Sequence, residues 1–343
     1  MAMLTAEYMA MPAIPEHAAM SLPPPTSRRR RKFVLIIALV TAAAALAFLR
    51  WPQPLADRPL VLRVASQLSA QSHAHVPVVL LHGVMDASTN RNMAALCDSV
   101  TATHAHTYVL CSSVGDGWAS LTPLAQQVEA FAASVRADAR LADGFDALGL
   151  SQGSLVLRAY AQQHNAPHVR QLLTVCGPHG GIGECPSSVQ GWLCGFWASS
   201  PYTAPIAFAD YWRGTDRAEY LARSRWLADV NNEGGEKNGS YARNMRALER
   251  YVLVKASDDH VVVPAVSAQH GYWRWGTREE VPLRETEGYL NDDLGLRTLE
   301  ESGRLDVLEY EGEHMEFHME YWQSTILPYL GRKWPVAKSK RTE

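Results

Sequence analysis

The order of short apolar runs and longer helical patterns restricts the fold of this chain more than any other feature of its sequence. Six runs of mainly apolar residues lie at 76–81, 107–111, 145–150, 171–175, 251–255 and 305–310. Between them, residues 121–135 and 154–163 carry apolar side chains at helical spacing. Strands that alternate with helices form a mainly parallel sheet covered on both faces. The sequence therefore predicts an α/β fold.

The alternation stops over residues 177–242. This segment contains four tryptophans, Trp192, Trp197, Trp212 and Trp226, together with many small residues. We interpret it as an insertion that packs as a cap over the carboxyl edge of the sheet. Its aromatic side chains form a satellite core, line a substrate pocket, or do both.

The size and charge of the chain indicate how its remaining segments are organised and which partners are excluded. Of its 343 residues, 47% are hydrophobic and 20% are charged, as in an ordinary globular protein. We assign residues 1–32 to a disordered leader, 50–75 to a linker, 76–332 to one domain and 333–343 to a polar tail. The formal net charge of −3, without a basic face in the domain, excludes a nucleic-acid partner.

A membrane-targeting element follows the leader. Four arginines and a lysine at 28–32 precede the uncharged residues 33–49, which are just long enough to span a membrane. The flanking charge predicts a type II signal anchor, whose membrane contact would lie in this segment. A cleaved signal peptide is the alternative, because Ala45-Leu46-Ala47 has the form of a cleavage site. Both deliver the domain to the lumen of the secretory pathway.

An oxidising lumen favours pairing among the five cysteines. Cys185 and Cys194 close a short loop in a Gly/Pro/Ser-rich segment and are the better disulfide candidate; Cys97 with Cys111 is weaker, because Cys111 lies in an expected strand. Cys176 ends an apolar strand and is expected to be a small buried hydrophobe.

Glycosylation has one candidate site. The sequon Asn238-Gly239-Ser240 lies in a polar, turn-rich stretch, where a glycan is tolerated.

A nucleophile is predicted at Ser151. Residues 149–153 read G-L-S-Q-G, directly after the expected strand 145–150 and before the expected helix from 154. In this context a G-x-S-x-G forms a sharp strand-to-helix turn that lifts the serine hydroxyl clear of the sheet. The following helix also points backbone N–H groups at a developing oxyanion. The motif predicts a serine hydrolase of the α/β-hydrolase fold.

A second loop supplies the rest of an expected oxyanion hole. The first strand ends in the H-G-V-M-D sequence at 82–86, which is similar to the oxyanion loops of lipases and esterases. The backbone N–H groups of Val84 and Gln152 are the candidates for stabilising a tetrahedral intermediate. His82 is expected to brace the loop, because in this fold the catalytic histidine comes last in the chain.

The acid and the base are expected after the last two strands. Asp258, Asp259 and His260 follow the strand 251–255, and His314 follows the strand 305–310. His314 is preferred as base over His260 and over His318, which is placed inside a terminal helix. The spacing leaves the choice between the two aspartates open.

Metal ligation was considered for two histidine pairs, His73 with His75 and His104 with His106. Alternate residues of a strand share a face, but neither pair has a third ligand at a recognisable spacing. They are interpreted as surface histidines, and no metal or other cofactor is expected.

Several collinear motifs make the chain from Val76 to Leu330 resemble the palmitoyl-protein thioesterase family. The matching stretches are 81–86 (LHGVMD), 149–153 (GLSQG), 211–212 (YW), 226–231 (WLADVN), 255–264 (KASDDHVVVP), 293–296 (DLGL) and 311–314 (EGEH). Cys185 and Cys194 also match a paired-cysteine region of the family. The chain departs from the first branch of the family at Ser154 and at 213–215, and Asp116-Gly117 is closer to the second, acyl-CoA-preferring branch.

This resemblance implies a lysosomal thioesterase with Ser151 as nucleophile, Asp259 as acid and His314 as base. The implied substrates are fatty-acyl thioesters, either S-acylated protein cysteines or acyl-CoA. A lipase or carboxylic-ester hydrolase of the same fold is the alternative, and a non-catalytic membrane-anchored binding domain is a further one.

Overall fold

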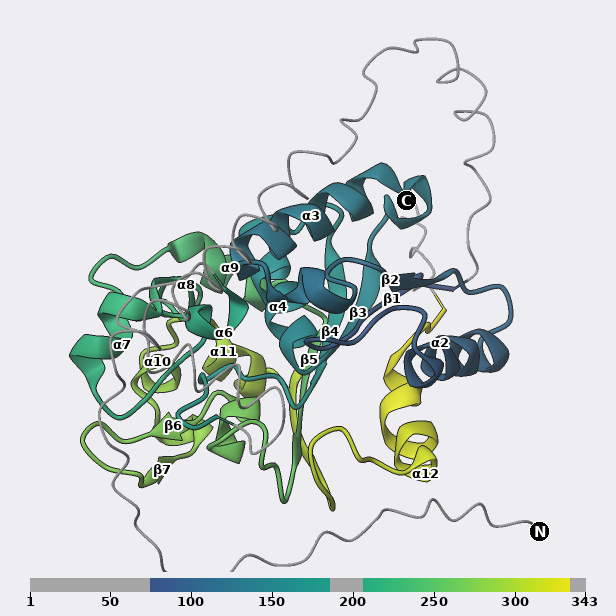
Figure 1. Ribbon diagram of the computed structural model, residues 1–343. Coiled ribbons are helices and arrows are strands. Elements are labelled where there is room, and N and C mark those ends of the chain that lie inside the picture. The colour runs from purple at the N-terminus through teal and green to yellow at the C-terminus, as the bar shows by residue number, and fades with distance from the viewer. Residues whose placement is uncertain (1–74, 186–205, 334–343) are drawn as a thin grey trace, which may run out of the picture. The chain divides into compact units, whose positions relative to one another are not determined.

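The computed structural model describes residues 75–185 and 206–333 (Figure 1). Its main sheet has six parallel strands in the order β2-β1-β3-β4-β5-β8. The strands are β1 (Val78–Leu81), β2 (Val109–Ser112), β3 (Phe145–Leu150), β4 (Val169–Val175), β5 (Arg250–Ala256) and β8 (Leu305–Tyr310). All six correspond to runs predicted from the sequence, so the predicted α/β fold with its parallel sheet is confirmed.

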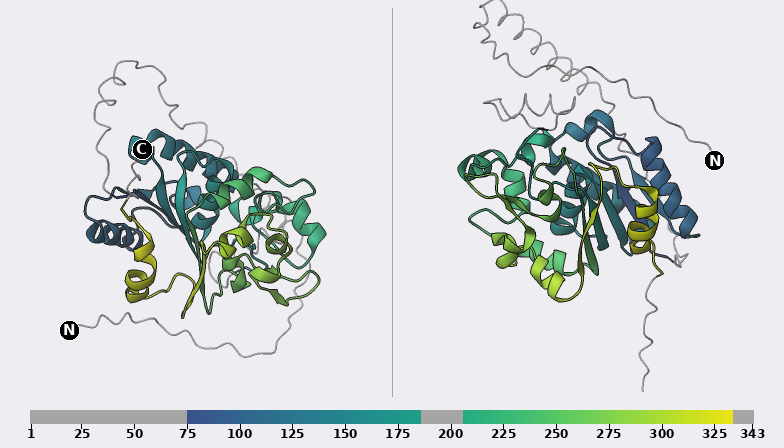
Figure 2. Two further views of the ribbon diagram at one scale, coloured as in Figure 1. Left: turned by 180° about the vertical axis from the view of Figure 1, so that it is seen from behind. Right: turned by 90° about the horizontal axis from the view of Figure 1, so that it is seen from below.

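Helices cover both faces of this sheet, as Figure 2 shows from two further directions. One face carries α2 (Arg91–Thr103), α12 (Met319–Tyr321), η6 (Trp322–Ile326) and η7 (Leu327–Tyr329); the other carries α3 (Leu124–Ala137), α4 (Gln152–Gln163), α9 (Gly239–Arg246) and α11 (Leu296–Glu301). Side chains of a strand point alternately to the two faces. Val78 and Leu80 therefore belong to one core, and Val79 and Leu81 to the other.

The two predicted helices differ from the observed ones at their first residues. The helix expected from 121 begins at Leu124, because Pro123 has an extended ψ of 139° and is its N-cap. The helix expected from 154 begins at Gln152, directly after Ser151. The strand-to-helix turn is thus as tight as the motif requires.

The smaller helices and strands lie in two segments that connect strands of the main sheet. The described part of the expected 177–242 insertion contains α6 (Ala207–Asp210), α7 (Arg217–Arg223) and α8 (Arg225–Val230); Trp212 and Trp226 are half-buried there against one of the two cores. Trp192 and Trp197 lie outside the described residues. The second segment, between β5 and β8, had no counterpart in the sequence analysis and contains η4 (Ala265–Gln269), β6 (Tyr272–Trp273), β7 (Glu280–Val281), η5 (Leu283–Glu285) and α10 (Glu287–Leu290).

The expected leader, the segment 33–49 and nearly all of the linker and polar tail also lie outside the described residues. Within 75–185 and 206–333, no helix combines the length and the apolar character that crossing a membrane requires.

The disulfide between Cys97 and Cys111, which was the weaker of the two candidates, is present. Cys97 on α2 is bonded to Cys111 on β2, with their Cα atoms 6.3 Å apart. The pairing is possible within a strand because the side chain of Cys111 lies on the face of the sheet that α2 covers. Cys185 takes part in a disulfide, while its expected partner Cys194 lies outside the described residues. Cys176 is a free, buried thiol.

The predicted glycosylation site is accessible. Asn238 is exposed at the N-cap of α9, where its side-chain oxygen accepts a hydrogen bond from the backbone of Ser240.

Candidate active site

The turn between β3 and α4 holds Ser151 in a strained conformation. Its φ of 49° lies in the left-handed region, which side-chain-bearing residues rarely adopt. The turn leaves no room for side chains on the flanking glycines: a Cβ on Gly149 would lie 2.5 Å from the Cα of Ser154, and one on Gly153 would lie 2.4 Å from the carbonyl oxygen of His82. Such strain is typical of functional sites and projects the Ser151 hydroxyl beyond the sheet.

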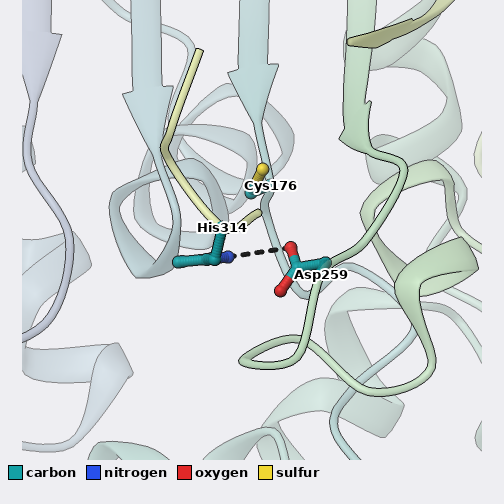
Figure 3. Close-up of side chains that lie close together, drawn as sticks. All are labelled: Cys176, Asp259 and His314. Atoms are coloured by element: carbon teal, nitrogen blue, oxygen red, sulfur yellow. Dashed lines mark hydrogen bonds and ion pairs between the residues drawn. The ribbon is translucent and has the colours of Figure 1, made fainter. Parts of the chain in front are cut away.

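Ser151, His314 and Asp259 form a continuous hydrogen-bonded chain across three strand ends. The Oγ of Ser151 lies 3.0 Å from Nε2 of His314. Nδ1 of the same ring lies 2.8 Å from Oδ2 of Asp259, and Figure 3 shows this second contact as a dashed line. Because β3, β5 and β8 are parallel, their carboxyl ends meet at one edge of the sheet. The arrangement has the geometry of a nucleophile, a base and an acid.

The backbone after β5 fixes Asp259 in place. Its Oδ1 accepts hydrogen bonds from the backbone N–H groups of Val261 and Val262, at 2.9 and 2.7 Å, which leaves Oδ2 for His314. Asp259 is buried, whereas Asp258 and His260 are exposed. Of the two aspartates that the spacing could not separate, Asp259 is the one in contact with the histidine.

The prediction that His318 lies inside a terminal helix is wrong. His318 is the extended N-cap residue of α12, a single short turn. The preceding loop brings His314, four residues earlier, to the serine.

The pKa of His314 reflects two opposing effects. Burial of the ring disfavours its charged form and lowers the pKa, whereas the hydrogen bond to Asp259 raises it, with a further contribution from Cys176. The net result is a pKa raised from 6.5 to about 9. The buried carboxylate therefore strengthens His314 as a proton acceptor.

The loop after β1 lies directly against Ser151. A Cβ on Gly83 would be only 3.1 Å from the Cβ of Ser151, so a glycine here lets the loop backbone lie close to the serine. Val84 lines the same pocket as Ser151 and His314, and Gln152 is the first residue of α4. The two backbone N–H candidates thus flank the serine on separate elements.

Residues from the η2 region (Gly117–Leu121) hold this loop in position. The imidazole of His82 lies 2.8 Å from Asp116, which also accepts from the backbone of Ser88, and the backbone N–H of Met85 donates to Ser120. His82 has the bracing contacts expected of it. The supporting role of Asp116 and Ser120 could not be predicted from the sequence, because no local pattern shows which loop they contact.

A pocket of about 680 Å³ opens beside Ser151. Met93 and Leu96 of α2 form one part of it, and Met315, Phe317 and Met319 form another; Asp86, Asn90 and Asn92 add polar groups. None of its lining residues comes from the described part of the 177–242 insertion. Apolar side chains of α2 and of the segment after His314 thus line this pocket, while Trp192 and Trp197 of the insertion lie outside the described residues.

The chain has clear relatives among known proteins. A family model described as palmitoyl protein thioesterase matches residues 77–314. Palmitoyl-protein thioesterase 3 of Dictyostelium discoideum is 35% identical over 284 residues, which cover 79% of this chain and 97% of that protein. Lysosomal thioesterase PPT2 of Mus musculus is 28% identical over 79% of this chain and 93% of its own length. Among solved structures, a monoacylglycerol lipase of Paleococcus ferrophilus has a TM-score of 0.42 and 13% identity, over 74% of this chain and 95% of that one.

Proposed function

Since this chain belongs to the palmitoyl protein thioesterase family, we propose that it hydrolyses fatty-acyl thioesters through an acyl-serine intermediate on Ser151. The observation that carries the proposal is the 3.0 Å contact between Ser151 Oγ and His314 Nε2 at the wall of an apolar pocket. A nucleophile with its base in hydrogen-bond reach, beside space for an acyl chain, is what acyl transfer requires.

In the first step, Ser151 attacks the thioester carbonyl carbon while His314 Nε2 accepts the hydroxyl proton. Asp259 holds the Nδ1–H tautomer and stabilises the imidazolium that forms. The carbonyl oxygen becomes an oxyanion, for which the backbone N–H groups of Val84 and Gln152 are the proposed donors.

The tetrahedral intermediate then collapses: the carbon–sulfur bond breaks, the sulfur takes the proton from His314, and the thiol leaves an acyl-serine beside a neutral imidazole. A thiol has a pKa of about 8.5, so its departure needs less protonation than that of an alkoxide. Water activated by His314 would attack the acyl-serine, releasing the fatty acid and restoring Ser151. The steps use side chains and backbone groups of the chain and water.

The pH dependence should follow the protonation of His314. A protonated ring cannot accept the Ser151 proton, so we expect the rate of Ser151 labelling by a small fluorophosphonate to fall as the pH drops through the pKa of His314. Because that pKa is raised, the midpoint should lie above 6.5. Labelling rates measured from about pH 5 to about pH 10 check this. A midpoint at or below 6.5 would show that Asp259 does not raise the pKa of His314.

The pocket beside Ser151 is the proposed acyl site. Burial of apolar surface is worth about 25 cal/mol per Å², or about 0.8 kcal/mol for each methylene. Lengthening the acyl chain should therefore raise kcat/KM stepwise until the pocket is full.

Filling the pocket should shorten the preferred chain. Ala95 lines it from the exposed side of α2, so Ala95→Trp occupies pocket space without disturbing the core. We expect this variant to lose long-chain more than short-chain turnover, in a series of acyl thioesters of graded length. Ala102→Trp, also exposed on α2 but outside the pocket lining, is the matched control. Equal losses at all lengths, or the same loss in the control, would mean that the acyl chain binds elsewhere.

The cellular setting of the proposal is the lumen of the secretory pathway. The basic cluster at 28–32 before the apolar segment 33–49 supports either an anchor or a cleaved signal, and two relatives in mammals are named lysosomal thioesterases. We propose a lysosomal or endosomal enzyme that contacts the membrane through residues 33–49 if this segment is retained.

A matched ester pair tests the reaction itself. Turnover of S-acyl and O-acyl esters with the same chain and the same acceptor skeleton should favour the thioester. A strong preference for the oxoester would instead identify a carboxylic-ester hydrolase. S-acyl peptides compared with acyl-CoA of equal chain length then decide the acceptor.

A further inference from the structure

A third potential ligand lies beside the Asp259–His314 pair. The Sγ of Cys176, a carboxylate oxygen of Asp259 and a ring nitrogen of His314 all lie within 4.8 Å of one another. Figure 3 shows the thiol next to the hydrogen bond between the other two side chains. Within the described ranges, this is the one cluster of three such side chains that is close enough to share an ion.

The fold itself places the thiol here. Cys176 follows β4, and its φ of 51° turns the chain at the carboxyl edge of the sheet. Its Sγ lies 3.2 Å from the hydroxyl of Tyr310, and that hydroxyl donates to the carbonyl oxygen of Glu313, next to His314. The thiol is therefore held in one position relative to the histidine loop.

We infer that Cys176, Asp259 and His314 form an inhibitory binding site for a thiophilic divalent cation, with Zn²⁺ as the expected ion. The inference rests on the proposed roles of Asp259 and His314 in catalysis. Thiolate sulfur, imidazole nitrogen and carboxylate oxygen are the three ligand types that zinc binds in proteins.

The side chains must move to bind the ion. Zinc binds sulfur at about 2.3 Å and nitrogen or oxygen at about 2.0–2.2 Å in a tetrahedral site, so two of its ligands lie about 3.3–3.6 Å apart. A separation near 4.8 Å must therefore close by about 1 Å, and the 2.8 Å contact between His314 and Asp259 must open by about 0.5 Å, which side-chain rotations supply. The thiolate and the carboxylate would neutralise the charge of the ion, which suits a buried site.

The cation can reach the cluster through the acyl pocket. The side chains of Cys176 and Asp259 are buried, but the His314 side chain is 13% exposed and lines the pocket together with Ser151. An ion in the pocket therefore meets the imidazole first. Water or the carboxylate of the fatty-acid product can complete a fourth position.

Zinc binding would inhibit catalysis because it changes the tautomer of His314. Nδ1 of His314 faces Asp259, and Nε2 faces Ser151. When zinc takes the Nδ1 lone pair, the Nδ1 proton must move to Nε2, and the Cys176 thiol releases its proton to solvent. Nε2–H can no longer accept the Ser151 proton, so the serine loses its base.

Two titrations on the purified protein test the site. Cd²⁺, followed by its thiolate-to-metal charge-transfer absorption, should bind with about one equivalent per chain, and Zn²⁺ should displace it. Zn²⁺ should lower both thioester turnover and fluorophosphonate labelling of Ser151 at least about tenfold, and a chelator should restore them. Cys176→Ala should abolish the absorption band and need at least about tenfold more Zn²⁺ for half-inhibition, measured against the variant's own turnover without metal.

The control is His164→Gln, which removes a surface histidine that pairs with Glu129 at 3.0 Å. It should remain as sensitive to Zn²⁺ as the wild type. If Cys176→Ala fails to fold, the near-isosteric Cys176→Ser gives the same readings. Equal inhibition of the wild type and the Cys176 variant, or no charge-transfer band in the wild type, would overturn the inference.

The absorption titration is independent of turnover. A chain that binds Cd²⁺ at Cys176 but cleaves no thioester would uphold the site and refute the proposed function. A chain that cleaves thioesters without binding Cd²⁺ would do the reverse.

Discussion

Ser151→Ala should abolish labelling by a fluorophosphonate and lower thioester turnover by at least about a thousandfold, because the covalent route through an acyl-serine is lost. The backbone N–H groups and the pocket remain, so substrate should still bind. The measurements are gel-based labelling, kcat, and binding of a non-hydrolysable acyl thioether.

The control for this prediction is Ser113→Ala, which removes an exposed hydroxyl after β2. It should label and turn over like the wild type. Labelling that persists in Ser151→Ala would place the nucleophile on another serine. Far-ultraviolet circular dichroism shows whether Ser151→Ala still folds, and so separates lost chemistry from lost folding. The fold is expected to be kept, because the φ of 49° at this position is no more strained for alanine than for serine.

Asp259→Asn should be the second most damaging change, with a loss of about 10³- to 10⁴-fold in kcat. Two backbone N–H groups bind Oδ1, so the amide oxygen of the asparagine should take that position and turn its NH₂ group toward His314. An NH₂ donor facing Nδ1 favours the tautomer with hydrogen on Nε2. His314 then presents a donor to Ser151 instead of an acceptor.

The neighbouring aspartate offers a matched comparison. Asp258 is exposed, and Asp258→Asn makes the same chemical change one residue earlier. Its kcat should stay within about threefold of the wild type, as expected for a surface site. If Asp258→Asn were the more damaging of the two, Asp258 would be the acid.

The sequence by itself determined the sheet, the elbow and the order of the reactive groups. Apolar runs such as 145–150 predict strands, because a strand buried on both faces needs apolar side chains at almost every position. The turn at Gly149 is equally local, because a Cβ there would lie against Ser154, five residues later. Gly153 is required by the end of β1 at His82, but its place in the G-x-S-x-G motif still marks it in the sequence. Periodicity and turn chemistry act over short stretches of chain, and a single sequence records them directly.

Only the tertiary structure decided which side chains meet. Spacing alone could not separate Asp258 from Asp259. The family resemblance favoured Asp259, and the backbone course after β5 gives the physical reason, because it buries Asp259 and exposes Asp258. The pocket wall of Met93 and Met315, and the position of Cys176 beside His314, join segments more than a hundred residues apart. Such contacts depend on the packing of whole elements against one another, and the local patterns of a sequence carry no record of that packing.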